Sequence, residues 1–167
     1  MTVIVPLAGP DFELDQEHTK AERLIDGVPL LLRCLNSRPW SRLGGDCLDY
    51  VFILQDTATS RDLATSKLRQ WFPSSKVIYL GAFSDGAAFS ALAGVALCDL
   101  GQPLIIDLAD IEFSAESFSI KDIFDGDDHI GAVALTFSSN ANMYSYIKED
   151  GGRFVEAVEK AVISEHA

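Results

Sequence analysis

The stretch "TVIVPLAGPDFELDQEHTKAERLIDGVPLLLRCLNSR" (residues 2–38) decides the fold, because it joins a buried strand to a helix through a long loop. The apolar run 2–8 is typical of a strand covered on both faces, and 28–38 predicts a helix. In α/β proteins the loop after a first strand often holds a phosphate. Between Pro10 and Asp26, however, this loop carries six acids against two bases. A phosphate loop needs glycines and cations, so any functional hypothesis has to explain this acidity.

Strands and helices continue to alternate along the chain. Further strands are predicted at 48–55, 76–81, 102–109 and 130–138, and helices at 60–72 and 85–98. Ser60 and Asp85 are the expected N-caps of these two helices. Near the end, 144–150 and 153–160 flank a Gly-Gly pair and predict a hairpin. We therefore expect a three-layer α/β/α, Rossmann-like fold with a mixed, mostly parallel sheet and a C-terminal β-hairpin.

Composition and charge restrict the class of protein. The chain has 167 residues, of which 48% are hydrophobic, and this is enough for a single domain spanning 1–167. Its formal net charge of −12 argues against nucleic acids and anionic membranes as partners, since both would repel it. No apolar run approaches the ~20 residues that span a bilayer, and the N-terminus lacks the basic segment of a signal peptide. These features predict a cytoplasmic protein.

Three loops are expected to surround one cleft, because ligands of open parallel sheets bind beyond the carboxyl ends of the strands. These loops follow Leu7, Gly81 and Leu108. The first leads to Lys20, a cation that could reach a phosphate. The second leads into the small-residue stretch 84–92. Its small side chains would let a flat ring lie against the backbone, or would allow close packing of a helix on the sheet.

The third loop carries three carboxylates, those of Asp107, Asp110 and Glu112. A carboxylate at the mouth of a parallel strand suits Mg²⁺, which binds one or two carboxylates together with substrate phosphates. The alternative is that Asp110 caps or turns the chain after the strand. The residues alone leave both interpretations open.

The order of these motifs resembles the sugar-phosphate nucleotidyltransferase family of the GT-A type, in the branch found with capsule and lipopolysaccharide biosynthesis. The resemblance covers essentially the whole chain and is most specific in its C-terminal segment. The segments that carry it are "LAG" (7–9), "TKAERLIDGVPLL" (19–31), "FSDGAAFSAL" (83–92), "PLIIDLADIEF" (103–113) and "YSYIKEDGGRFVEAVEKAVIS" (144–164). The resemblance implies that a nucleoside triphosphate lies over the first loop and that a sugar phosphate lies against the last strand. Mg²⁺ would neutralise the charge that develops at the attacked phosphate.

The resemblance also implies particular site residues. It implies Asp110 as a catalytic residue and the Mg²⁺ ligand. Lys20 is the second expected catalytic residue, not by a motif match but because it lies two residues before Glu22 and would compensate for the family's lysine if the loop is remodelled. Nucleotide and sugar phosphate would be held by residues in three matching motifs: Leu7, Ala8 and Gly9; Gly86 and Ala87; and Glu159 and Lys160.

Two departures from the family concern the acidic loop. Residues 10–13 replace a second glycine and an arginine, and Glu22 falls where the family has a lysine. At about 4 Å and an effective dielectric of about 20, exchanging a cation for an acid changes each phosphate contact by several kcal/mol. Two hypotheses therefore stay open. The chain is either a working nucleotidyltransferase or a relative without transfer activity that binds a sugar or nucleotide, with a binding or regulatory role.

The family domain continues beyond the matching segment with another strand and a second metal-binding acid. We therefore expect either a shortened form of the domain or a piece of a longer gene product. We also expect a homodimer, because the missing segment would leave apolar area exposed.

Overall fold

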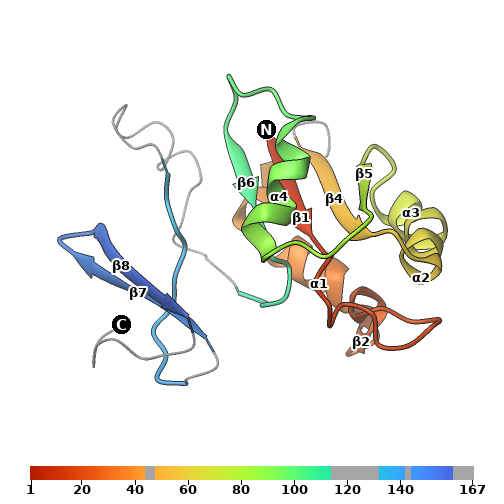
Figure 1. Ribbon diagram of the computed structural model, residues 1–167, viewed down its shortest axis with the longest axis horizontal. Helices are drawn as coiled ribbons and strands as arrows, with labels where there is room; N and C mark the ends of the chain where they lie inside the picture. Colours follow the sequence, from red (N-terminus) through yellow and green to blue (C-terminus); the bar gives the residue numbers. More distant parts are fainter. Residues whose placement is uncertain (44–47, 114–131, 142–143, 160–167) are drawn as a thin grey trace. The chain divides into compact units, whose positions relative to one another are not determined.

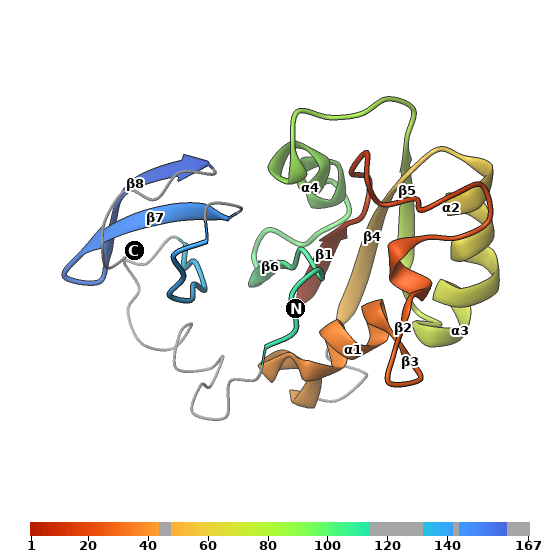
Figure 2. The same ribbon diagram turned by 90° about the horizontal axis from the view of Figure 1, so that it is seen from below.

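A computed structural model describes residues 1–43, 48–113, 132–141 and 144–159 (Figures 1 and 2). The chain divides into two compact units, Met1–Gly126 and Asp127–Ala167. The single-domain organisation expected from the sequence stays a prediction. Among the described residues, no helix combines the length and the apolarity that a membrane crossing requires.

The first unit is built on a four-stranded parallel sheet with the strand order β5-β4-β1-β6. These strands are Thr2–Pro6 (β1), Asp49–Gln55 (β4), Lys76–Leu80 (β5) and Leu104–Ile106 (β6). The chain builds the sheet outward from β1 to β5 and then returns to place β6 on the other side of β1. The carboxyl ends of β1 and β6 therefore form the switch point at which open α/β sheets bind ligands. The expected α/β, Rossmann-like class is confirmed.

Helices cover both faces of this sheet (Figure 2). On one face, Val3 and Val5 of β1 pack in one cluster with Leu31 and Leu35 of α1 (Leu30–Ser37). The side chain between those two valines points to the opposite face, where it packs beneath α4 (Ala87–Val95). A Cβ on Gly94 of α4 would come within 2.9 Å of this isoleucine, Ile4. Ala91, in the small-residue stretch 84–92, is buried in the same cluster as Ile4, so this stretch serves close packing of a helix on the sheet.

The predicted helix at 60–72 is observed as one continuous helical segment, made of α2 (Ala58–Asp62), a π-helical stretch (Leu63–Leu68) and α3 (Arg69–Trp71). The prediction of Ser60 as N-cap is wrong, because the side chain of Thr57 accepts the hydrogen bond from the Ser60 backbone N–H. Asp85 is likewise not the N-cap of α4. Gly86 takes that position, without a side-chain hydrogen bond.

The second unit contains the expected hairpin, formed by β7 (Ser145–Asp150) and β8 (Arg153–Glu159). Its turn, Gly151-Gly152, has positive φ at both positions (57° and 77°), which glycine adopts without strain. The strand predicted at 130–138 is wrong over 132–138, where the chain forms no strand. Residues 130 and 131 lie outside the described part.

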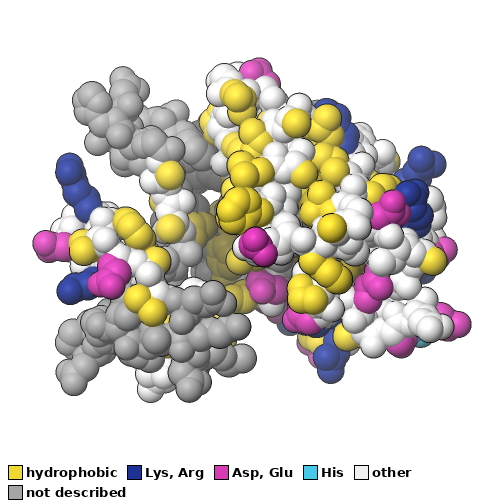
Figure 3. Space-filling model, in the orientation of Figure 1, with side chains coloured by type: hydrophobic (Ala, Val, Ile, Leu, Met, Phe, Trp, Pro, Cys, Tyr) yellow, Lys and Arg dark blue, Asp and Glu magenta, His cyan; other side chains and the backbone are white. Residues whose placement is uncertain are grey.

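Apolar side chains gather on the outer side of α4 (Figure 3). Phe89 and Leu92 are 62% and 61% exposed, and Ile106 of the edge strand β6 is also exposed. Such a surface is compatible with the expected homodimer, which stays a prediction.

Candidate functional site

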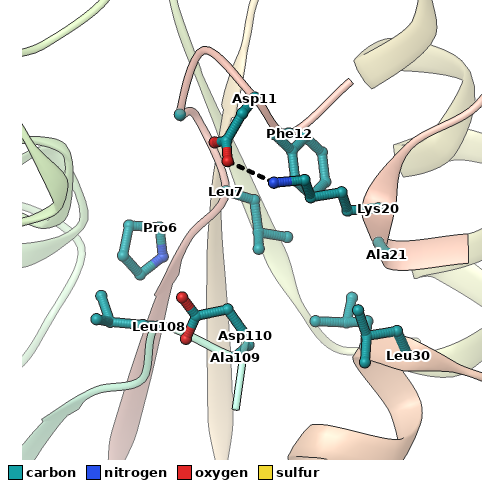
Figure 4. Close-up of a pocket in the computed structure, with 12 residues that line it drawn as sticks. Pro6, Leu7, Asp11, Phe12, Lys20, Ala21, Leu30, Leu108, Ala109 and Asp110 are labelled. Carbon is teal, nitrogen blue, oxygen red and sulfur yellow. Dashed lines mark hydrogen bonds and ion pairs between the residues drawn. The ribbon is translucent and has the colours of Figure 1, made fainter. Parts of the chain in front are cut away.

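A pocket lies at the switch point of the sheet, between the loop after β1 and the loop after β6 (Figure 4). It holds about 150 Å³. This is below the roughly 300–1,000 Å³ of pockets that enclose a whole drug-sized ligand, so it has room for a phosphate group and an ion. Its lining residues are Pro6, Leu7, Gly9, Asp11, Phe12, Lys20, Ala21, Leu30, Leu31, Leu108, Ala109 and Asp110.

The acidic loop builds the upper wall of this pocket around a buried phenylalanine. The backbone N–H of Phe12 donates to Gly9 O (3.1 Å), and the N–H of Lys20 donates to Phe12 O (2.8 Å). These bonds hold Asp11 and Lys20 side by side, and their side chains form an ion pair at the pocket (Figure 4). The hydrogen bond from Lys20 lowers the pKa of Asp11, which favours its carboxylate form.

The other two acids implicated by the family resemblance do not line this pocket. Glu22 Oε2 accepts from the backbone N–H (3.1 Å) and the hydroxyl (3.0 Å) of buried Thr19, which caps the short helix Lys20–Glu22. Glu13 Oε1 accepts from the hydroxyls of Thr57 and Ser60 (2.9 Å for Ser60) at the start of α2. Glu22 therefore does not line this pocket. Asp11 is the acid of this loop that lines the pocket.

The three carboxylates after β6 have different surroundings. Asp107 is buried and paired with Arg38, and Glu112 pairs with Arg33 of α1 (2.5 Å). Asp110 lines the pocket and forms no ion pair with any described residue. It is therefore the one of the three whose charge is available to a ligand.

The electrostatic state of Asp110 reflects this position. Desolvation at the pocket wall raises the pKa of its carboxyl, although the residue as a whole is exposed. A hydrogen bond from the backbone of Asp110 itself and the positive charges of Arg38 and Lys20 oppose this shift, but do not cancel it. A cation bound at Asp110 would relieve the desolvation penalty of the charged form.

The local turn after β6 is made by Asp107 rather than by Asp110. Asp107 Oδ1 accepts from the backbone N–H of Ala109 (2.9 Å), and Ala109 has a positive φ of 56°. Among the described residues, the side-chain hydrogen bond that supports this turn therefore comes from Asp107.

The remaining residues singled out by the resemblance are distributed as follows. Leu7 and Gly9 line the pocket, whereas Ala8 is buried in the core beneath α4. Gly86 and Ala87 begin α4, are exposed and are not among the lining residues. The second expected loop, after Gly81, does not line this pocket.

The Glu-Lys pair belongs to the second unit. Glu159 ends β8, and its side chain and the whole of Lys160 lie outside the described part. Their assignment to the site stays a prediction.

Asp11 and Arg38 are the residues that sequence reasoning did not select. Asp11 looked like one of many loop acids. Asp107, the partner of Arg38, lies 69 residues away in the sequence, and no local sequence pattern predicts such a pair.

The structure therefore defines a Rossmann-like α/β fold with a pocket at the switch point of its sheet. A solved structure with this fold is the nucleoside-diphosphate-sugar pyrophosphorylase from Vibrio cholerae RC9. It matches with a TM-score of 0.66 over 99% of this chain and 69% of that chain, at 18% sequence identity. No protein-family model and no curated protein matches the sequence. The similarity is therefore one of fold.

Proposed function

We propose that the chain binds the phosphate of a nucleotide or sugar phosphate, together with Mg²⁺, in the pocket between β1 and β6. In this proposal it is a cytoplasmic, nucleotidyltransferase-like domain of surface-polysaccharide biosynthesis. The observation that supports it best is the placement of Asp110, a carboxylate without an ion-pair partner among the described residues, in the same switch-point pocket as Lys20.

The donor set suits a metal that arrives with a phosphate. Within the described residues, no group of three or more His, Cys, Asp and Glu side chains could hold a metal ion. Mg²⁺ needs less than this, because it is commonly bound through one or two carboxylates plus substrate phosphates. Asp110 would be the protein ligand, and Mg²⁺ would neutralise charge on the phosphate.

The charges in the pocket favour binding without transfer. Lys20 contributes +1, and Asp11 and Asp110 contribute −1 each, so the lining residues sum to −1. A free polyphosphate would be repelled by this pocket, whereas Mg²⁺ bound to the phosphate would reduce this repulsion and be attracted to Asp110. Nucleotidyl transfer also needs preorganised positive charge at the attacked phosphate, and Lys20 is already paired with Asp11.

Calorimetric titration with Mg²⁺ and pyrophosphate tests the proposal, followed by each common nucleoside triphosphate. We expect Mg²⁺-dependent binding that is weaker than about millimolar for the triphosphates, since the pocket holds little more than a phosphate. Asp110→Asn should abolish the Mg²⁺ dependence. Asp85→Asn, an exposed carboxylate at the start of α4, is the matched control and should leave it unchanged. Binding that is independent of Mg²⁺, or unaffected by Asp110→Asn, would contradict the proposal.

Active nucleotidyl transfer is the second candidate, and the presence of Lys20 in the pocket lining favours it. In that case Lys20 would leave Asp11 and contact the α-phosphate. Release of pyrophosphate on mixing a nucleoside triphosphate with a sugar 1-phosphate, lost in Lys20→Met, would establish transfer.

A further inference from the structure

We infer that Arg38 is a positioning residue that holds the carboxylate of Asp110 at the pocket by tying down the backbone on both sides of it. This inference rests on the proposed role of Asp110 as a Mg²⁺ ligand. Arg38 itself does not line the pocket, and at 2% exposure it is sealed behind the loop.

The guanidinium of Arg38 makes contacts to two points of the loop after β6. Its Nε and Nη2 donate to the two carboxylate oxygens of Asp107, at 2.8 and 2.9 Å. Its Nη1 donates to the backbone carbonyl of Ile111, at 2.7 Å. The planar group also stacks over the ring of Phe113, 4.3 Å from the ring centre. Three residues before Asp110 and one residue after it, the chain is therefore fixed to the end of helix α1.

Asp107 passes this constraint on to the turn that presents Asp110. Its backbone N–H donates to Ile4 O (2.9 Å), which continues the pairing of β6 with β1. Its Oδ1 also accepts from the Ala109 N–H, which holds that residue at a positive φ. A non-glycine residue in this conformation needs such support from its surroundings. The Arg38–Asp107 pair supplies that support, and the next residue is Asp110.

Only arginine can make this set of contacts. Its rigid fork binds a carboxylate through two donors and keeps a third for the carbonyl, whereas lysine offers a single point charge. Arg38→Lys therefore keeps the positive charge but loosens the loop. Groups that orient a metal ligand typically contribute about 10–100-fold to metal affinity.

Arg33 provides a matched control on the same helix. It reaches the same loop through Glu112, but its side chain is 30% exposed and the contact is at the surface. Surface ion pairs contribute little, so Arg33→Gln should change metal affinity by less than about twofold.

The test uses Mn²⁺ as the metal probe, in the presence of pyrophosphate, on the full chain. Mn²⁺ bound at Asp110 broadens the backbone amide signals of residues 108–111 in a two-dimensional NMR spectrum. We expect the Mn²⁺ concentration at half-broadening to rise at least about 10-fold in both Asp110→Asn and Arg38→Lys. Mg²⁺ should compete about 10-fold less well in Arg38→Lys. Ca²⁺, which tolerates irregular geometry, should compete with Mn²⁺ nearly as well as in the wild-type chain. The ratio of Mg²⁺ to Ca²⁺ competition therefore reports the geometry of the site, because general destabilisation would not change this ratio.

The outcomes distinguish a failure of the metal role of Asp110 from a failure of the positioning role of Arg38. If the wild-type chain shows no broadening at 108–111, or Asp110→Asn behaves like wild type, the proposed metal role fails. If those two behave as expected but Arg38→Lys matches Arg33→Gln, the positioning role is overturned. Should Arg38→Lys not fold, the double variant Arg38→Met/Asp107→Asn removes both charges and keeps an acceptor for Ala109. It should show the same loss of Mn²⁺ affinity, and wild-type affinity in this variant would also overturn the inference.

Discussion

Replacing Asp107 by asparagine should be among the most destabilising single changes in the first unit. The substitution leaves the Arg38 charge buried without a carboxylate, because the side chains of this pair are only 2% and 4% exposed. Removing one partner of a buried ion pair costs about 3–5 kcal/mol. Against a total stability of about 5–15 kcal/mol, this is a large fraction. Arg38→Met should cost a similar amount, since it leaves the buried Asp107 carboxylate without its arginine partner.

The double variant is what distinguishes a buried charge from lost packing. In Arg38→Met/Asp107→Asn neither charge of the pair remains in the interior, and the introduced asparagine side chain still offers an oxygen to the Ala109 N–H. The main remaining defect is the Ile111 carbonyl, at about 1–3 kcal/mol. The two single costs sum to about 6–10 kcal/mol, so the coupling free energy should be at least about 3 kcal/mol.

Urea unfolding followed by tryptophan fluorescence measures these free energies for the first structural unit, Met1–Gly126. Both tryptophans of the chain, Trp40 and Trp71, belong to the first unit and pack on its core. Trp40 also contacts Phe113 edge to face (6.4 Å between ring centres), close to the ion pair. Single variants that cost less than about 1 kcal/mol would refute the reasoning. So would a double variant whose cost equals the sum of the singles.

Four further outcomes follow from the structure. Asp11→Asn frees the pocket lysine from an exposed ion pair worth about 0.2–1 kcal/mol, so pyrophosphate affinity, measured by calorimetry, should rise about 1.4- to 5-fold. Metal binding needs the ionised carboxylate, and the pKa of Asp110 is raised. As the pH is lowered from neutral, Mn²⁺ broadening should therefore be lost at a higher pH than an ordinary aspartate would give. A carboxyl ¹³C titration of Asp110 checks the raised pKa. The pair Glu13→Arg/Glu22→Lys should lower the urea midpoint without strengthening triphosphate binding, since neither side chain lines the pocket. Gly94→Val should destabilise the first unit by at least about 1–3 kcal/mol in urea unfolding, because a Cβ at this position would overlap the side chain of Ile4 in β1.

The sheet was predictable because each strand is a local apolar run. The four strands of the parallel sheet fall within the predicted ranges, and the Gly-Gly pair correctly marked the hairpin turn. The short strands Leu24–Ile25 (β2) and Val28–Pro29 (β3) were not predicted. The helix caps were not predictable in the same way. Thr57 and Ser60 are both capping residue types, so their identities alone do not decide which one caps the helix. Both hydroxyls also donate to Glu13, which lies more than 40 residues earlier in the chain.

Part of the site was also predictable. A carboxylate after the fourth strand and a lysine near the first loop were expected, and both line one pocket because parallel strands end at one edge. The resemblance singled out Asp110 among the three acids, but the residues alone did not show which of them faces the pocket. That choice depends on Arg33 and Arg38, which neutralise Glu112 and Asp107 from a helix far away in the sequence.

The acidity of the first loop has a structural explanation in this fold. Glu22 satisfies the donors of a fully buried threonine, and Glu13 ties the loop to the start of α2. A loop made of glycines and cations would lack both of these anchors and would depend on a bound phosphate for its order. Here the loop is held by its own carboxylates, and only Asp11 of these three acids faces the pocket. Of the three acids that argued against a bound phosphate, only Asp11 would therefore repel a phosphate in this pocket, and its charge is already paired with Lys20.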